Sequence, residues 1–311
     1  MGPINVYLAD GAELTLIDTG PQDPPTLDAL RAELRARGVA FKDIRRIIVT
    51  HAHVDHFGLA AQIVAESDAP VLSHRLNQWW LTDFKREWER RYDFYRDVFA
   101  RSGAPLEYAE KVVAGMQRLA DYADSVPADH FVPLEEGDAL RLGGEPWRVV
   151  YAPGHAHGLI CLHDPASRTL ISSDHLLRDI TSNPVMEPPA RGETARPRAL
   201  IDYMASMERT ARLNVGIALP AHGEPIDHVS ALVNQRMAFH RARLDQIEQQ
   251  LECCAQTPYE ICNILFPKLR SFDTFLGLSE VIGHLDVLEA EGRVRLDVSD
   301  GLWRYIPTRR S

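Results

Sequence analysis

Four side chains able to bind a metal ion crowd into one short segment of the chain. The segment Thr50–His56 reads THAHVDH, and it directly follows Ile44–Val49, an apolar, β-branched run typical of a buried strand. Imidazole and carboxylate groups are preferred ligands of zinc and of other borderline metal ions. Because buried polar side chains need partners, three histidines this close together are hard to satisfy in a purely structural role. The potential ligands are His51, His53, Asp55 and His56.

Three further metal-binding side chains follow strand-like runs elsewhere in the chain. His155 lies in the segment APGHAHG, Asp174 in SSDH and His222 in PAHG, and each comes shortly after such a run. In α/β folds, functional side chains gather at the carboxyl ends of strands. A folded sheet could therefore bring these residues back to Thr50–His56, which makes a chance occurrence of the first motif a poor explanation.

The segments around these residues predict an α/β layered domain. Strands are expected at Asn5–Leu8, Glu13–Ile17 and Ile44–Val49, and a helix with leucines at helical spacing follows Pro25 and ends at Gly38. This order of two strands, a helix and a strand is typical of layered α/β proteins. Later in the chain we expect strands at Glu145–Tyr151, Leu159–His163, Thr169–Ser172 and Val215–Pro220, and helices at Leu200–Leu213 and Val229–Cys254.

Residues 75–130 differ from the rest of the chain, since they are rich in charged and aromatic side chains and read as a helical insertion. This aromatic stripe could simply pack on the core. It could also form a cap over an active site, in which Trp80 and Trp88 offer an apolar pocket to a substrate. The packing interpretation and the cap interpretation both hold if the cap docks on the core. The aromatic residues recur at spacings of three or four, which places them on one helix face: Trp80, Phe84, Trp88, Tyr92, Tyr95 and Phe99.

The last part of the chain reads as a small module. The segment Thr257–Glu260 is a helix start, with a Thr cap, Pro at the first position and Glu at the third. A second helix, Leu278–Ala290, precedes a hairpin of Gly292–Asp297 and Leu302–Ile306. Helices followed by a β-hairpin describe a winged-helix-like unit. We therefore predict a main domain over residues 1–240, and a linking helix with the winged-helix-like domain over residues 241–311.

Composition and charge narrow the class of partner. The 311 residues carry a formal net charge of −10, whereas proteins that hold a phosphate backbone usually present a basic face. None of the four cysteines sits in a CxxC pair, and no signal peptide or membrane-spanning run is visible. We expect a reduced, cytoplasmic protein with a small-molecule substrate and without a membrane or nucleic-acid partner. The insertion and the C-terminal module could each support a homodimer.

The chain resembles the metallo-β-lactamase superfamily over essentially its full length. The resemblance rests on motifs that occur in a specific order and spacing: LIDTG at Leu16–Gly20, THAHVDH at Thr50–His56, APGH at Ala152–His155, SSDH at Ser172–His175 and PAHGEP at Pro220–Pro225. It implies a four-layer αβ/βα sandwich with a dinuclear metal site at one edge. The C-terminal module resembles the winged-helix-like tail of one bacterial branch of these hydrolases.

The resemblance also implies roles for individual residues. It implies that His51, His53 and His155 hold the first metal ion, that Asp55, His56 and His222 hold the second, and that Asp174 bridges the two. Two divalent ions per chain are implied, with zinc expected first and manganese or iron as alternatives. Asp55 is the catalytic candidate, because it could hold the nucleophile and pass a proton to the leaving group. Asp18, in the LIDTG turn, would orient the site from behind the ligands.

The chain departs from the common pattern of the superfamily in two places. Ser173 stands where a glycine usually precedes the bridging aspartate, and the segment after His155 reads Ala-His-Gly where a small hydroxyl residue is common. Neither change removes a ligand. His157 and His175 are therefore extra histidines, which we expect to be hydrogen-bonding neighbours of the site or substrate contacts.

The substrate does not follow from the family, because one fold hosts many reactions. We expect hydrolysis of a small acyl compound (a thioester, a lactone or another ester), since the insertion offers an apolar pocket. The alternative is an endoribonuclease or phosphodiesterase, but the arginines of the insertion are interleaved with acidic residues. A further alternative is a mononuclear-iron oxidoreductase that resembles persulfide dioxygenases, which the seven-ligand set disfavours. A DNA reader is disfavoured because Asp273–Glu291 contains acidic residues and no Lys or Arg.

Overall fold

Two five-stranded β-sheets form the centre of the protein, as seen in a computed structural model that describes residues 3–269 and 272–308. In the first sheet, the strand nearest the N-terminus pairs antiparallel with its neighbour, and the other three pairs are parallel. In spatial order, its strands are β1 (Tyr7–Ala9), β2 (Thr15–Ile17), β3 (Arg46–Ile48), β4 (Val71–His74) and β5 (Phe131–Leu134).

The second sheet is mostly antiparallel. Its strands in spatial order are β10 (Ile217–Pro220), β9 (Thr169–Ser173), β8 (Ile160–Asp164), β7 (Glu145–Tyr151) and β6 (Ala139–Leu142). Within this sheet, β10 and β9 pair in parallel and the other pairs are antiparallel. Because β7 and β9 both run antiparallel to β8, the strands β7, β9 and β10 point the same way, and their carboxyl ends lie at one edge.

The two sheets pack against each other through side chains that alternate along the strands. Ile47 and Ile48 are neighbours and both fully buried, but Ile48 belongs to the layer between the sheets and Ile47 to the layer against the helices. The layer between the sheets contains Ile17, Ile48, Leu72 and Leu134 of the first sheet and Leu140, Leu142, Val149, Ile160, Leu162 and Ile171 of the second.

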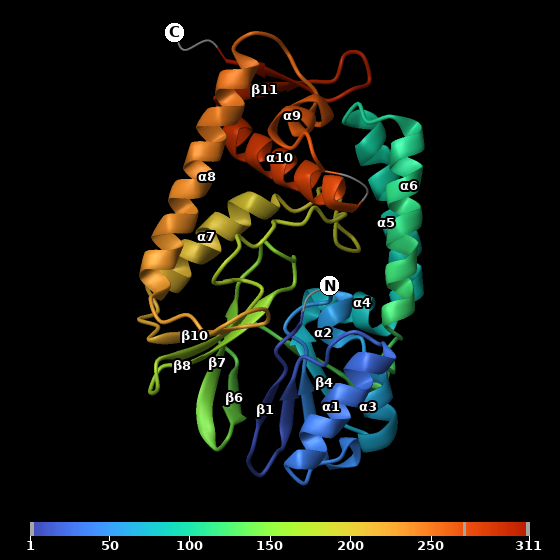
Figure 1. Cartoon of the computed structure of the whole chain (residues 1–311), viewed down its shortest axis with the longest axis vertical. Coiled ribbons are helices and arrows are strands. Elements are labelled where there is room, and N and C mark those ends of the chain that lie inside the picture. Colours follow the sequence, from blue (N-terminus) through green and yellow to red (C-terminus); the bar gives the residue numbers. More distant parts are fainter. Residues whose placement is uncertain (1–2, 270–271, 309–311) are drawn as a thin grey trace.

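Helices cover the outer faces of both sheets (Figure 1). The helices of the first half are α1 (Pro24–Ala36), α2 (Val54–Phe57) and α3 (Ala60–Ser67), and those of the second half are α7 (Ala199–Ala211) and α8 (Val229–Leu251). Leu34 and Ile63 pack on the first sheet, and Leu200 and Met207 pack on the second. This is the predicted four-layer αβ/βα sandwich. Short 3₁₀ turns occur at Phe41–Asp43, Arg75–Asn77, Arg118–Tyr122 and Ala128–His130.

The predicted helical insertion is present as three helices: α4 (Gln78–Thr82), α5 (Phe84–Arg101) and α6 (Leu106–Gln117). The aromatic stripe is broken at Asp83, so Trp80 lies on α4 and the later members on α5. Phe84, Tyr95 and Phe99 are almost fully buried, so most of the stripe packs on the core. The packing interpretation is therefore right for α5.

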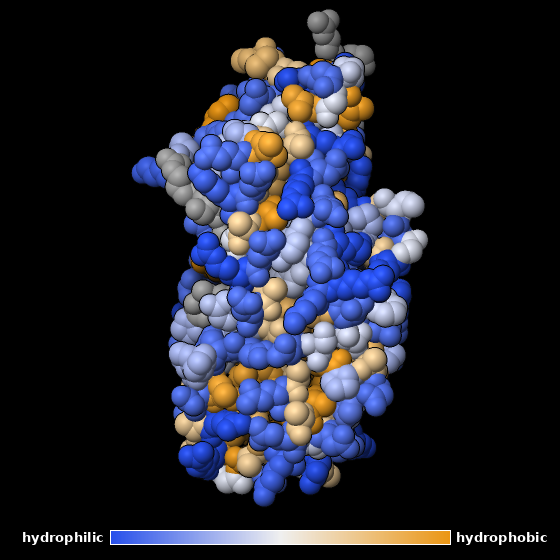
Figure 2. Space-filling model, turned by 90° about the vertical axis from the view of Figure 1, so that its right-hand side faces the viewer, coloured by the Kyte–Doolittle hydropathy of each residue, from blue (hydrophilic) through white to orange (hydrophobic). Residues whose placement is uncertain are grey.

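The outer face of the insertion is hydrophilic. Figure 2 shows the side of the molecule on which α5 and α6 lie, and hydrophobic residues appear there only in small, separate groups. Ion pairs such as Arg96–Asp93, Arg101–Asp97 and Lys111–Glu107 place both signs of charge side by side. A surface of this kind is neither an apolar patch nor a basic stripe.

The C-terminal part contains two helices and a hairpin in the predicted order. These are α9 (Pro258–Leu265), α10 (Phe272–Ala290), β11 (Val294–Asp297) and β12 (Arg304–Pro307), and the two strands pair antiparallel. The expected capping box is present, because Thr257 Oγ1 accepts from Glu260 N at 3.3 Å and Glu260 Oε2 accepts from Thr257 N at 2.8 Å. The assignment of this unit as a winged helix stays a prediction.

Helix α10 docks on α7 and α8 (Figure 1). A Cβ atom at Gly283 would lie only 3.0 Å from Leu200 Cβ, so glycine permits close packing at this contact. Arg196 forms a bidentate pair with Asp286 at 2.6 and 2.7 Å. Helix α8 runs unbroken across residue 240, where we predicted the domain boundary, and the division into two domains stays a prediction.

Several boundaries differ from those expected. Helix α10 begins at Phe272 rather than Leu278, and α8 ends at Leu251 rather than Cys254. The first strand begins at Tyr7 rather than Asn5, because the Asn5 backbone N–H donates to Ala221 O at 2.7 Å instead of to the neighbouring strand β2. Strands β4, β5 and β6 were not predicted. Among the described helices, none is long and apolar enough to cross a membrane.

Two buried histidines join α8 to α10. His240 Nδ1 lies 3.2 Å from His284 Nε2, and His284 Nδ1 donates to Glu280 O at 2.6 Å. Burial lowers the pKa of His240 to about 4, and the charges of Arg236 and Arg243 act in the same direction. Burial also lowers the pKa of His284 to about 3. Both side chains are therefore neutral in the folded protein near neutral pH.

This pair predicts a loss of stability in weak acid. The unfolded chain binds protons at these histidines near pH 6.5, whereas the folded chain binds them only near their lowered pKa values, so the free energy of unfolding falls as the pH drops from about 6.5 to about 4. Urea unfolding across this range should show a fall larger, by the order of 2 kcal/mol, than in a His240→Gln/His284→Gln double variant. Equal pH dependence in both proteins would contradict the assignment.

Candidate metal centre

The candidate ligands lie in segments that follow the carboxyl ends of strands. The motif THAHVDH follows β3, and α2 begins inside it at Val54 with His53 as its N-cap. His51 and His53 therefore belong to the loop, and Asp55 and His56 to the first helical turn, as the strand-to-helix interpretation predicts. Of the other ligands, Asp174 directly follows β9, and His155 and His222 lie shortly after β7 and β10.

Gly154 explains how the chain turns before His155. Its φ angle is +138°, and a Cβ atom there would clash with the backbone and Cβ of Tyr203 on α7. Only glycine therefore allows α7 to approach the loop this closely. The turn directs His155 toward the end of β3 and toward the THAHVDH segment.

The structure brings all seven predicted ligands together in three overlapping groups. Within each group the ligand atoms lie within 4.8 Å of one another. The first contains His51, His53 and His155, and the second contains Asp55, His56 and His222. The third contains His51, His56 and Asp174, and it joins the other two. The grouping agrees with the ligand assignment that the family resemblance implies.

Distances within the groups suit cation binding. The Nδ1 atom of His53 lies 3.0 Å from His51 Nε2 and 3.0 Å from His155 Nε2. Asp174 faces both sides, because Oδ2 lies 3.3 Å from His155 Nε2 and Oδ1 lies 3.7 Å from His222 Nε2. A carboxylate with its two oxygens turned toward two neighbouring groups is placed to bridge two ions.

The protonation states of the first group support this fit. Burial lowers the pKa of His53 to about 3, and burial lowers the pKa of His51 well below its ordinary value. Burial also lowers the pKa of His155. Neutral imidazoles carry a lone pair, and lone pairs that converge within hydrogen-bond distance repel one another unless a cation or a proton lies between them. The geometry and protonation of the first group are therefore suited to holding a cation.

The two groups that share His56 contain buried negative charge. Burial raises the pKa of Asp174, but the charges of His56 and His155 outweigh this and lower it to about 2. Burial lowers the pKa of His56, yet Asp18, Asp55 and Asp174 together raise it well above its ordinary value. His56 Nε2 and Asp174 Oδ1 are buried without a hydrogen-bond partner. Orphaned polar atoms of this kind are rare, and a metal ion would satisfy both.

Hydrogen bonds behind the ligands set which ring nitrogen is free. The Nδ1 of His155 donates to Asn183 O at 2.9 Å, and the Nδ1 of His222 donates to Pro3 O at 2.8 Å. The Nδ1 of His56 donates to Asp18 Oδ2 at 2.8 Å. In each case the neutral imidazole has its lone pair on Nε2, which is the nitrogen turned to the centre.

Asp18 joins β2 to the THAHVDH segment. Its carboxylate accepts from Thr50 N at 2.8 Å, from Thr50 Oγ1 at 2.8 and 3.0 Å and from His56 Nδ1 at 2.8 Å. Its backbone has a φ of +59°, a left-handed conformation that is uncommon for residues other than glycine. Ser173 also lies in this region, with a φ of +48°, and its Oγ lies 2.7 Å from Thr50 Oγ1. Ser173 thus adopts the left-handed backbone conformation that the usual glycine at this position favours.

The other candidate residues lie in different places. His157 and Trp80 line a cavity of ≈ 240 Å³. His157 is two residues after the candidate ligand His155 in the chain. Trp88 is buried, contacts the rings of Trp80 and Tyr92 and is not among the residues that line the cavity. These contacts support core packing, and a substrate contact of Trp88 stays a prediction.

His175 lies away from the cavity. It is fully buried, and its Nε2 lies 2.8 Å from Thr210 Oγ1 of α7. The ring of Tyr203, also on α7, packs edge-on against it. His175 therefore holds α7 against the end of β9. Of the two expected roles, these contacts support that of a hydrogen-bonding neighbour of the site rather than that of a substrate contact.

Sequence reasoning missed the segment between residues 176 and 198, which forms one wall of the site. Ser182 Oγ and Asn183 O both lie 2.9 Å from His155 Nδ1. Glu187 is buried, and its Oε2 accepts from His157 N at 2.9 Å while its Oε1 accepts from Arg91 Nη2 at 3.0 Å. The segment has no helical or strand periodicity, so its position next to His155 left no pattern to read.

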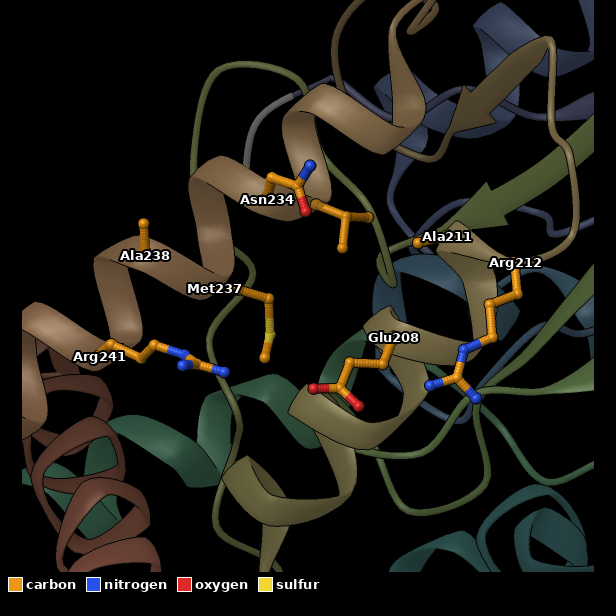
Figure 3. A pocket seen from close by; sticks show the side chains of 8 residues that line it. Glu208, Ala211, Arg212, Asn234, Met237, Ala238 and Arg241 are labelled. Carbon is orange, nitrogen blue, oxygen red and sulfur yellow. The ribbon is translucent and has the colours of Figure 1, made fainter.

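A second cavity, of ≈ 420 Å³, lies elsewhere, between α7 and α8 (Figure 3). Glu208 of α7 faces Met237 and Arg241 of α8 across it. None of the seven candidate ligands lines either cavity, but the smaller cavity includes His157, which is two residues from the candidate ligand His155. Of the two cavities, the smaller one is therefore the one joined to the candidate centre through the chain.

Comparisons with known proteins place the chain in a family. A model of the metallo-beta-lactamase superfamily matches residues 1–222. The probable metallo-hydrolase YqjP of Bacillus subtilis (strain 168) is 35% identical over 295 residues, which are 94% of this chain and 89% of YqjP. The chain therefore belongs to the metallo-beta-lactamase superfamily, and the predicted metal-dependent hydrolase is confirmed at the level of this family.

Solved structures extend the similarity to the whole fold. A metallo-beta-lactamase family protein from Thermus thermophilus matches with a TM-score of 0.83 and 27% identity, over 98% of this chain and 94% of that chain. A beta-lactamase domain protein from Burkholderia ambifaria matches with a TM-score of 0.82 and 25% identity, over 98% and 88% of the two chains. Because both matches cover nearly the whole chain, the insertion and the C-terminal part belong to the shared fold.

The geometry predicts the metal content of the purified protein. The three groups should bind close to two divalent ions per chain, and His222→Ala should lose about one, since His222 belongs to only one group. Mass spectrometry of the dissolved ions measures identity and stoichiometry together. His228→Ala, at an exposed histidine that caps the start of α8, should keep the full content. One iron ion per chain in the unaltered protein would instead indicate the mononuclear oxidoreductase.

Proposed function

We propose that the chain is a metal-dependent hydrolase of a small acyl compound, namely a thioester, a lactone or another ester, and that the seven candidate ligands would hold two metal ions that supply an activated water. The observation that carries this proposal is the overlap of the three ligand groups through His51 and His56, which places Asp174 in the group that joins the other two, close to a cavity partly walled by Trp80. Two bound cations would lower the pKa of a shared water and polarise the acyl oxygen. The residues of the chain must supply position, proton transfer and exclusion of water.

Asp55 is placed for proton transfer. Its Oδ2 lies 3.5 Å from His222 Nε2, and its Oδ1 lies 3.9 Å from His56 Nε2. Burial raises the pKa of Asp55, but the neighbouring histidines, His56 first, outweigh burial and hold it below its ordinary value. An ionised carboxylate in this position can orient the nucleophile and carry its proton to the departing thiol or alcohol.

The surroundings of the centre favour a small substrate. Helices α4 and α5 form one wall of the cavity and the 176–198 segment forms another. The acidic and basic side chains that alternate along α5 offer no continuous basic track for a nucleic acid. On α10, the acidic residue Asp286 is paired with Arg196 of the main part of the chain, which supports packing rather than phosphate recognition.

The proposal predicts that single ligand changes stop turnover. His53→Ala and Asp174→Ala should each lower kcat for thioester hydrolysis by about 1,000-fold or more, because each removes a group that positions the centre. Released thiol measures turnover, and circular dichroism with thermal unfolding checks that the variants are folded. His228→Ala should keep its activity. Retained turnover in either ligand variant would refute the proposed site.

A further inference from the structure

The cavity beside the candidate metal centre is not the simple apolar pocket that the aromatic stripe suggests. Trp79 and Trp80 line it, but so do four arginines and two glutamates. The charged lining residues are Arg75, Arg90, Arg91, Arg191, Glu87 and Glu187. In a chain with a net charge of −10, a cavity with more cationic than anionic lining residues is a local reversal of sign.

The oxygens of the two glutamates are already bound. Glu87 is 4% exposed, its Oε2 accepts from Arg90 at 3.0 and 3.2 Å, and its Oε1 accepts from Arg191. Glu187 is 6% exposed and accepts from Arg91 and from the backbone of His157. Each of the four carboxylate oxygens thus already accepts a hydrogen bond from the protein. The glutamates therefore hold the arginines in place.

The arginines, in contrast, keep spare donors. Arg91 is 7% exposed, and its Nε is buried without a hydrogen-bond partner. Arg75 pairs with Glu135 through Nε at 2.8 Å, and among the described residues no hydrogen bond is formed by its two terminal nitrogens. Glu135 lies behind Arg75 and does not line the cavity. A ligand that accepts hydrogen bonds would satisfy these groups, whereas an apolar chain would leave them desolvated.

The tryptophans hold two of the guanidinium groups flat. The Arg91 guanidinium lies 3.8 Å from the centre of the Trp80 ring, and the Arg191 guanidinium lies 4.3 Å from that of Trp79. Contact with an aromatic face restrains the guanidinium group and leaves its positive charge unneutralised. Trp79 is 44% exposed, so the mouth of the cavity also offers an apolar surface.

The cavity is physically joined to the candidate ligands. Glu187 bonds at one end to Arg91 and at the other to His157 N, which is two residues from His155. The same segment supplies the carbonyl of Asn183 to His155. The charges of Glu187 and His53 also interact, so Glu187 lies near both Arg91 and the first ligand group.

We infer that this cavity binds an anionic oxygen group of the substrate, a carboxylate or a phosphate, at the end remote from the bond that is hydrolysed. The inference rests on the proposed function, because it assumes that an acyl compound reacts at the centre. Planar guanidinium donors match the geometry of such oxyanions. The substrate class is thus a small acyl compound that carries its own negative charge.

Matched thioesters test the inference on the zinc-loaded full chain. One pair is the glutaryl and hexanoyl thioesters of N-acetylcysteamine, which differ by a charge on the acyl end. The other pair is the hexanoyl thioesters of 3-mercaptopropionate and of butanethiol, which differ by a charge on the thiol end. In at least one pair, kcat/KM for the anionic member should exceed that for the neutral member by about tenfold or more. A ratio near one in both pairs would overturn the inference.

A variant separates the cavity from a general effect of charge. Arg75 is 61% exposed, so Arg75→Gln should fold, and it should reduce the anionic-to-neutral ratio by about fivefold or more. The matched control is Arg212→Gln, an exposed arginine of the other cavity, and it should leave the ratio unchanged. An unchanged ratio in Arg75→Gln would show that the preference arises elsewhere.

A binding measurement distinguishes failure of this inference from failure of the proposed function. Glutarate and propyl phosphate are titrated separately into the zinc-loaded protein, and the fluorescence of the tryptophans reports occupancy. Saturable binding of either anion that weakens in Arg75→Gln supports the anion site even if no thioester, lactone or ester is hydrolysed, and the tighter anion identifies the group. Absence of binding by both anions would overturn the inference even if neutral thioesters are good substrates.

Discussion

Buried negative charge at the end of the sandwich is the constraint on which the rest of the structure depends. Asp18, Asp55 and Asp174 are held within reach of His56, and within the described part of the chain none of the three forms an ion pair with an arginine or lysine. Isolated carboxylates are costly to bury, and converging imidazoles are costly to dehydrate. Cations at this point would offset both costs at once. The ligands, their hydrogen bonds and the covering segments all follow from this requirement.

The two sheets serve this constraint by fixing distances between residues far apart in the chain. His51 and His155 are separated by more than a hundred positions, yet each lies in a loop at the end of a strand whose inward face is packed between the sheets. Ile48 of β3 and Val149 of β7 belong to that layer. Because closely packed interiors resist sliding, the register of the sheets becomes the geometry of the centre.

The ligand residues could be predicted from sequence because their signal is local. Histidines and aspartates directly after apolar runs are readable without a structure, and the family motifs name the set. The orienting groups could not be read in the same way. Asn183 and Pro3 act through backbone carbonyls, which every residue has, so their side chains carry no trace of the role. Glu187 looks like any surface glutamate until Arg91 is seen beside it.

The fold was predicted where periodicity is strong and missed where packing decides. Strands β4 to β6 are four residues long, and Ser73, Pro133 and Arg141 interrupt their apolar runs, so no distinctive pattern is left in the sequence. The aromatic stripe had the right helical period, but the period does not say which neighbour each ring meets. Trp88 faces the core, whereas Trp80 is turned to the cavity by the break at Asp83. Side chains on one predicted face therefore took different roles.

The C-terminal part and the insertion act on the centre through the same segment. Helix α10 holds the 176–198 segment from one side, because Leu276 O accepts from the Asn183 side chain at 3.0 Å. Helix α5 holds it from the other side, because the Tyr95 hydroxyl donates to Met186 O at 3.1 Å. The carbonyl of Asn183 in turn orients His155. A chain cut before α10 would therefore lose a support of the ligand shell as well as a peripheral module, which gives a physical reason for the tail to be part of the fold.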